Sequence, residues 1–212
     1  MSAQAFYSKI APLYDAGLWL NGYKRAARYV VAQLPFGKDE SFAVLDAGCG
    51  TGLYSIAVLK RFPKARVLAV DFNAAMARQM AASVKRHGFA HRAEVRVGDA
   101  LGEVTDKEEW FDLIVTGGLL EYIPLQPAVR NLARYLRTGG YFLNSPVRDN
   151  IWGALVGKWA KFEPYPAQQN LSVFTENGFA LLKTLPLPPR YFPISLVKEA
   201  HLFRKKSPPG RR

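Results

Sequence analysis

Three glycines and one aspartate near the start of the chain have the spacing of a ligand-binding loop. Segment 44–52 reads Val-Leu-Asp-Ala-Gly-Cys-Gly-Thr-Gly, with an apolar run before it and a helical pattern after it. Gly48, Gly50 and Gly52 have no side chains, so the backbone can turn tightly and a ligand can lie against it at a helix N-terminus. The alternative is a structural turn that Asp46 caps.

Two further aspartates follow later apolar runs. Asp71 ends the run 65–71 and lies nineteen residues after Gly52, and Asp99 follows the run that ends at Gly98. An acidic residue about 20 residues after a glycine loop is the spacing with which nucleotide sites hold a ribose. The alternatives are that Asp71 caps the next helix and that Asp99 is an ordinary loop residue.

The glycine loop differs from that of dinucleotide-binding proteins. Their loop has another glycine three residues after the second one, and Leu53 stands at that position here. Asp46 also lies inside the end of the expected strand. Both features disfavour a nicotinamide dinucleotide as the ligand.

Short apolar runs alternate with helical patterns along most of the chain, which predicts a parallel sheet. The expected fold is α/β, a Rossmann-like seven-stranded, mostly parallel sheet with helices on both faces and an N-terminal helical lid. Strands are expected at 42–47, 65–71, 93–98, 111–116, 140–145, 180–185 and 198–204. Helices are expected at 3–20, 22–34, 54–61, 74–87, 126–136, 152–162 and 171–179.

The length and composition favour one domain. The chain has 212 residues, of which 49% are hydrophobic, enough for a single packed core. We expect a single domain over 1–212, with a helical lid at 1–40, a ligand-binding core at 41–145 and substrate-side helices and the last strands at 146–203. The remainder, 204–212, is expected to be a disordered basic tail.

Residue counts exclude several classes of protein. The single cysteine excludes an internal disulfide, and the three histidines lack metal-ligand spacing, so no metal is expected. No run is apolar and long enough to span a bilayer, and no secretory leader is recognisable, so we expect a cytoplasmic location. The oligomeric state is not predicted.

The formal charge is +12, and residues 151–212 contribute ten Lys and Arg against three Glu, or +7. Such a balance favours anionic partners, although it also describes an ordinary solvated surface. A further hypothesis is weak peripheral association with acidic membranes through Arg204, Lys205 and Lys206.

The motifs together resemble the class I S-adenosylmethionine-dependent methyltransferases. The loop 45–52 has the form of that family's first motif, and Asp71 stands at its second. Later matches follow in the family's order at 98–100, 111–119 and 136–140. Five ordered matches cover about half of the chain.

The resemblance implies S-adenosyl-L-methionine as cofactor, with S-adenosyl-L-homocysteine as product and no metal. It implies that Asp71 holds the ribose hydroxyls, that Asp99 meets the adenine amino group and that Gly117 lies beside the methionine part. Phe72 and Met76 would pack on the adenine, although Met76 equally suits the core. The expected cofactor-binding residues are Tyr7, Tyr14, Asp46, Gly48, Cys49, Gly50, Gly52, Asp71, Phe72, Met76, Asp99, Ala100 and Gly117.

The N-terminal segment 7–15 is similar to the opening of the ubiquinone and menaquinone biosynthesis methyltransferases. In that type a Phe/Tyr-x-x-x-Ala-x-x-Tyr-Asp segment folds over the cofactor, so Tyr7 and Tyr14 would be lid residues; the alternative is that both are core aromatics. Segment 120–124 corresponds to a Leu-Glu-His-Ile-Pro stretch of these relatives, with Tyr122 in place of the histidine. Any inherited acid or base role is therefore in doubt.

Methyl transfer needs few catalytic side chains, because the sulfonium methyl is already activated and the enzyme mainly aligns the acceptor and excludes water. The catalytic residues are unknown; Tyr122, Tyr14 and Glu121 are candidates for proton removal. Aromatic residues after the fifth strand suggest a flat or lipid-like, quinone-type acceptor, unless they form the core under the lid. They are Trp152, Trp159, Phe162 and Tyr165.

Two alternatives to a small-molecule methyltransferase remain. The basic charge allows a nucleic-acid (RNA) methyltransferase, but 116–119 reads Thr-Gly-Gly-Leu instead of the Asn/Asp-Pro-Pro-Tyr stretch of enzymes that methylate exocyclic amines. Nucleic acid is therefore an unlikely partner. A non-catalytic S-adenosylmethionine-binding protein is the second alternative, and the set Asp46, Asp71 and Asp99 argues against it.

Overall fold

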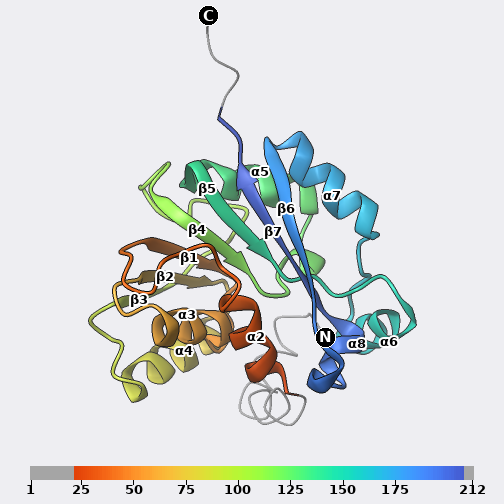
Figure 1. Ribbon diagram of the computed structural model, residues 1–212, viewed down its shortest axis with the longest axis horizontal. Helices are drawn as coiled ribbons and strands as arrows, with labels where there is room; N and C mark the ends of the chain where they lie inside the picture. Colours follow the sequence, from red (N-terminus) through yellow and green to blue (C-terminus); the bar gives the residue numbers. More distant parts are fainter. Residues whose placement is uncertain (1–21, 208–212) are drawn as a thin grey trace, which may run out of the picture.

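The computed structural model describes residues 22–207, which form a seven-stranded sheet with the strand order β3-β2-β1-β4-β5-β7-β6 (Figure 1). Strands β1 to β5 run parallel, and β7 pairs antiparallel with both β5 and β6. The strands are β1 (Ala43–Ala47), β2 (Arg66–Asp71), β3 (Ala93–Val97), β4 (Phe111–Thr116), β5 (Leu136–Asn144), β6 (Phe179–Pro186) and β7 (Glu199–Lys205). The predicted α/β fold is confirmed.

Helices cover both faces of the sheet (Figure 1). One core contains buried residues of α2, α3 and α4, and the other contains those of α5 and α7. The helices are α2 (Tyr23–Val31), α3 (Leu53–Arg61), α4 (Ala74–Arg86), α5 (Leu125–Tyr135), α6 (Ile151–Ala160), α7 (Ala167–Glu176) and α8 (Ile194–Val197), with 3-10 turns η1 (Leu120–Tyr122) and η2 (Pro189–Tyr191). No helix within residues 22–207 is long and apolar enough to cross a membrane.

The central strands β1 and β4 are mostly apolar, apart from Asp46, Asp112 and Thr116, because both faces of the sheet are covered there. In β1 the last four residues are buried, and in β4 only Asp112 is partly exposed. The chain passes from β1 outward to β2 and β3, then returns to β4 on the other side of β1. At such a reversal of strand order the carboxyl ends of the strands leave a crevice, where ligands bind in α/β proteins.

The structure corrects three predicted boundaries. A helix was expected to end at 136 and a strand to begin at 140, but β5 begins at Leu136. Gly139, with φ 75°, lies within an irregular part of the pairing between β5 and β4. Helix α7 begins at Ala167 instead of 171. Strand β7 extends to Lys205, so the tail predicted over 204–212 was wrong at its beginning, because these residues pair with β5 and β6.

Two of the three charges in the membrane hypothesis are engaged within the protein. Arg204 Nε donates to the carbonyl oxygen of Gly139, and Lys205 Nζ donates to the carbonyl oxygens of Ala133 and Leu136. The expected helix 3–20 lies outside the described residues, as does the end of the tail at 208–212.

Candidate cofactor site

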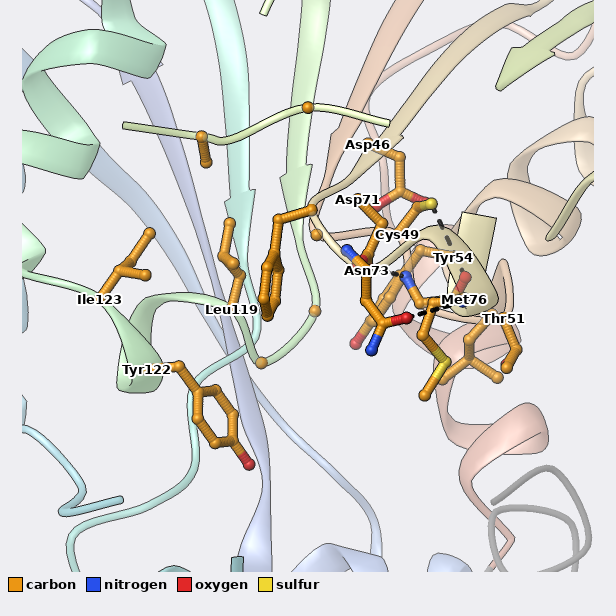
Figure 2. A pocket seen from close by; sticks show the side chains of 18 of the residues that line it. Asp46, Cys49, Thr51, Tyr54, Asp71, Asn73, Met76, Leu119, Tyr122 and Ile123 are labelled. Atoms are coloured by element: carbon orange, nitrogen blue, oxygen red, sulfur yellow. Dashed lines mark hydrogen bonds between the residues drawn. The ribbon is translucent and has the colours of Figure 1, made fainter. Parts of the chain in front are cut away.

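A cavity of about 310 Å³ lies at the crevice beside β1, β2 and β4 (Figure 2). The loops that follow these three strands and β3 supply most of its walls, and Tyr23 of α2 also lines it. Ten of the expected cofactor-binding residues line it, namely Asp46, Gly48, Cys49, Gly50, Asp71, Phe72, Met76, Asp99, Ala100 and Gly117. Tyr7 and Tyr14 lie outside the described residues.

Gly50 and Gly52 serve different purposes in the glycine loop. Gly50 has φ 53°, and no other atom comes within 4 Å of the position that a Cβ would occupy, so the backbone is open there. Gly52 has φ 91°, and a Cβ would lie 2.0 Å from Met80 Sδ. Gly52 is not among the described residues that line the cavity, and its lack of a side chain lets α3 pack against α4; its predicted part in binding the cofactor stays a prediction.

Asp46 anchors the loop from inside the protein. One carboxylate oxygen accepts hydrogen bonds from both the backbone N–H and the hydroxyl of Ser55, in the first turn of α3. Burial raises the pKa of Asp46 from 3.8 to about 6, while the two bonds from Ser55 oppose that rise. The capping alternative stated for Asp46 is thus confirmed, although the residue also lines the cavity.

Asp71 joins the ends of β1 and β2. Its Oδ2 accepts from Gly50 N at 2.8 Å and its Oδ1 accepts from Asn73 N at 2.9 Å. Burial is the main cause that raises the pKa of Asp71, against these two backbone bonds. Asn73, and not Asp71, caps α4, because its side-chain oxygen accepts from Ala75 N and Met76 N. The bond from Asn73 N matches the capping alternative for Asp71 in part, although the side-chain cap of α4 itself is Asn73.

The loop after β3 forms another part of the wall. Asp99 is exposed, and its Oδ1 accepts from Leu101 N at 2.9 Å, which leaves its other oxygen for a ligand. Phe72 is 47% exposed although it lines the cavity, whereas Met76 is buried. An exposed aromatic face beside a carboxylate suits a flat heterocycle with an amino group.

Cys49 is a buried thiol in the cavity wall. Burial is the first cause that raises its pKa well above the ordinary value, and the nearby carboxylates of Asp46 and Asp71 add to the rise. A thiol in these surroundings stays protonated and is a poor nucleophile. Cys49 therefore serves as a small wall residue.

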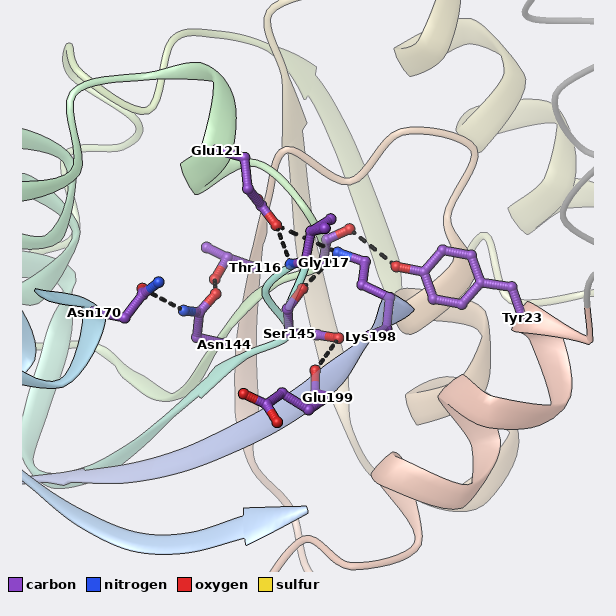
Figure 3. Close-up of polar contacts among 10 residues, drawn as sticks. Tyr23, Thr116, Gly117, Glu121, Asn144, Ser145, Asn170, Lys198 and Glu199 are labelled. Carbon is purple, nitrogen blue, oxygen red and sulfur yellow. Dashed lines mark hydrogen bonds and ion pairs between the residues drawn. The ribbon is translucent and has the colours of Figure 1, made fainter. Parts of the chain in front are cut away.

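The loop after β4 closes the cavity opposite Asp71. Leu119, Tyr122 and Ile123 point into it from this side (Figure 2). A Cβ at Gly117 would lie 2.6 Å from the ring of Tyr54, so the loop can approach α3 only with glycine there. The hydroxyl of Tyr23 donates to the carbonyl oxygen of Gly117 at 3.4 Å (Figure 3).

A buried ion pair between Lys198 and Glu121 supports this loop on the side that faces the protein interior (Figure 3). Lys198 Nζ lies 3.5 Å from Glu121 Oε1, and both side chains are at most 6% exposed. Lys198 Nζ also donates to the carbonyl oxygen of Ser145 at 2.7 Å, and Glu121 Oε1 accepts from Val147 N. Glu121 is not among the described lining residues, so among the candidates for proton removal only Tyr122 is placed in the cavity.

The aromatic residues expected to close an acceptor pocket do not line the cavity in the described part of the chain. Trp152 and Trp159 are 50% and 62% exposed on α6. Phe162 packs edge-on against Tyr122, with ring centroids 4.9 Å apart, and the Tyr165 hydroxyl donates to the carbonyl oxygen of Ile123. Phe162 and Tyr165 therefore contact the lining residues Tyr122 and Ile123 without lining the cavity themselves.

Several lining residues were not predicted. Tyr23, Tyr54 and Asn73 all belong to the wall. Asn73 had a recognisable signal, since it directly precedes a helical pattern and is a preferred capping residue. Within residues 22–207 no three His, Cys, Asp or Glu side chains are grouped so as to hold a metal ion.

The strand order, the glycine loop after β1 and the carboxylate after β2 define a Rossmann-like protein with a nucleotide-type site. Residues 44–140 match a protein family described as a methyltransferase domain. The structure is similar to geranyl diphosphate methyltransferase in complex with SAM (TM-score 0.73, 16% identity, 86% of this chain and 85% of that chain) and to the [4+2]-cyclase SpnF (0.81, 16%, 98% and 98%). Residues 44–140 are therefore a methyltransferase domain by sequence, and the chain has the Rossmann-like fold of these solved structures.

Relatives in sequence have different acceptors. The chain is 30% identical over 140 residues to ribosomal protein L11 methyltransferase of Syntrophomonas wolfei, covering 66% of this chain and 44% of that protein. It is 29% identical over 180 residues to malonyl-[acyl-carrier protein] O-methyltransferase of Bacillus cereus, covering 82% and 62%. The chain thus spans about half the length of the relatives that it matches.

The environment of Asp46 predicts a specific dependence of stability on pH. Its carboxyl ionises at 3.8 when unfolded and at about 6 when folded. Between these values only the folded state holds the proton, so the free energy of unfolding falls as pH rises, by about 3 kcal/mol over the whole window at ~1.4 kcal/mol per unit. Urea unfolding should show a steeper fall in the wild type than in Asp46→Asn, where Asp71, whose pKa is also raised by burial, still contributes. Parallel profiles for the two proteins would contradict the assignment.

The packing of Gly52 predicts a large loss of stability on adding one methyl group. Gly52→Ala combines a left-handed backbone with a collision at Met80, and we expect it to cost about 3 kcal/mol. Gly178→Ala is the matched control, because Gly178 has φ 83° with no atom near the added Cβ, and should cost about 1 kcal/mol. Equal losses in urea unfolding would show that the contact with Met80 is unimportant.

Proposed function

We propose that the protein transfers a methyl group from S-adenosylmethionine to a small-molecule acceptor. The observation that carries this proposal is the cavity of about 310 Å³ in which the Gly50 backbone, Asp71 and the loop 117–119 meet. Each oxygen of Asp71 accepts one backbone hydrogen bond, and an ionised carboxylate has about four acceptor sites, so lone pairs remain for a vicinal diol.

The lining residues fit the parts of this cofactor. Asp71 would hold the ribose hydroxyls, and Asp99 with Phe72 would hold the adenine. The backbone at Gly48 and Gly50 would lie along the amino-acid part, beside Gly117. When bound, S-adenosylmethionine supplies an electrophilic methyl group.

The contribution of the chain is to position the acceptor and to exclude water. Leu119 and Ile123 provide an apolar wall on the side opposite Asp71, which favours an acceptor with an apolar part (Figure 2). Tyr122 presents the ionisable side chain closest to this wall and is the candidate for receiving a proton from the acceptor. A quinone-type acceptor stays a prediction, because the aromatic residues that suggested it lie elsewhere.

A second candidate is a protein that binds the cofactor and does not transfer its methyl group. The similarity in fold to a protein named as a [4+2]-cyclase shows that this fold occurs with other chemistry. Binding and transfer must therefore be measured separately. Formation of S-adenosylhomocysteine across a panel of carboxylate, hydroxyl, amine and carbon acceptors distinguishes the two candidates. Transfer to none of them, by protein that binds the cofactor, would favour the second.

Loss of the Asp71 carboxylate should weaken cofactor binding. We expect Asp71→Asn to raise the dissociation constant for S-adenosylhomocysteine at least about tenfold, or ~1.4 kcal/mol, because one charged acceptor for the ribose is lost. Calorimetric titration measures this directly. Asp39→Ala, an exposed carboxylate outside the cavity, is the control and should bind as the wild type does. Absence of binding by folded wild type would refute the proposed function.

A further inference from the structure

A second cleft lies behind the glycine loop, between α2, α3 and α4, which are neighbours on one face of the sheet (Figure 1). Its volume is about 90 Å³, much smaller than that of the cofactor cavity. One face of α3, with Leu53, Ile56 and Ala57, forms the floor. The remaining lining includes five basic side chains from three helices, namely Lys24, Arg28, Lys60, Arg86 and His87.

Within the part of the chain that the structure describes, no carboxylate pairs with these charges. Helices α2, α3 and α4 together contain eight Lys and Arg and not one Asp or Glu. None of the described residues that line the cleft is acidic. Within residues 22–207 the structure shows no hydrogen bond or ion pair for the charged groups of Lys24, Arg28, Lys60 and Arg86. The cleft is therefore a concentrated positive site.

Several basic side chains elsewhere in the described structure have a carboxylate partner. Arg134 pairs with Glu108, Arg137 with Asp112, and Lys205 with Glu109. In the cleft, by contrast, Lys24 and Arg28 are four residues apart on one helix, where like charges destabilise it. Unpaired like charges that converge on a cavity raise the local concentration of anions.

The size and charge of the cleft indicate the class of ligand. The N-terminal turn of α3 at Gly52 and Leu53 adds the positive end of a helix dipole to the cationic side chains. A single carboxylate would leave most of these charges unbalanced, whereas phosphate groups carry several acceptor oxygens for Lys and Arg. The confined space differs from the extended basic track along which a nucleic-acid backbone binds.

We propose that this cleft binds the phosphate or diphosphate group of a small phosphorylated ligand. The site is distinct from the cofactor cavity, although Thr51 and Leu53 line both. A ligand in the cleft would contact the same loop from the opposite side.

Calorimetric titration with inorganic phosphate and with pyrophosphate tests the proposal. We expect pyrophosphate to bind the wild type more tightly than phosphate, because more charges are matched. The double variant Arg28→Gln/Lys60→Gln should weaken pyrophosphate binding at least about tenfold. Lys64→Gln/Arg66→Gln removes the same charge from exposed positions outside the cleft and should change it less than about twofold.

Thermal unfolding gives a second readout that does not depend on enzyme activity. Pyrophosphate should raise the Tm of the wild type and of the control variant, but not that of Arg28→Gln/Lys60→Gln. Without anion the cleft variant should be at least as stable as the wild type, because repulsion is removed. A less stable cleft variant would show that these cations are structural and would overturn the proposal.

Three further outcomes would also overturn it. They are no binding of either anion, equal weakening in the two double variants, and tighter binding of a single-stranded oligonucleotide that is lost in the cleft variant. S-adenosylhomocysteine should bind the cleft variant as it binds the wild type. The two proposals can therefore fail separately.

Discussion

The cavity depends on a carboxylate that the protein keeps out of water. Asp46 accepts two hydrogen bonds from Ser55, and this contact holds the first turn of α3 against the end of β1. When α3 is fixed, the ring of Tyr54 lies so close to position 117 that only glycine fits there. The backbone N–H of Gly50 is then placed to donate to Asp71. A single buried group thus sets the relative positions of the loops after β1, β2 and β4. The cost is visible in the raised pKa of Asp46.

The sequence was most informative where local chemistry and topology agree. Apolar runs followed by polar turns located all seven strands, and the signal is strongest in central strands such as β1 and β4, where both faces of the sheet are covered. The spacing from Gly52 to Asp71 then placed both near the same crevice, since one helix and one strand separate them. Of these two, only Asp71 proved to be part of the wall.

The predictions failed where the same residue type is found in two different structural settings. Glycines with positive φ occur both in turns and in irregular strands, so Gly139 could not be assigned from sequence to the interior of β5. Helix α6 has a similar ambiguity. Its aromatic residues suggested a buried face, but the helix packs through Gly153, Gly157 and Ala160, whose small size lets the backbone approach its neighbours. Contacts between distant residues, such as Tyr23 with Gly117, leave no local pattern.

The loop on the acceptor side of the cavity is supported by an ion pair between Glu121 and Lys198, a residue that is synthesised near the end of the chain. Strand β7 is the last strand of the described chain, yet it lies inside the sheet, between β5 and β6. Lys198 directly precedes it and reaches back to the carbonyl oxygen of Ser145 and to Glu121. During synthesis the loops that surround Asp71 are therefore available well before the loop that carries Tyr122 is supported. A chain that ended before β7 would therefore contain the residues around Asp71 but would lack the ion pair that supports the loop of Tyr122.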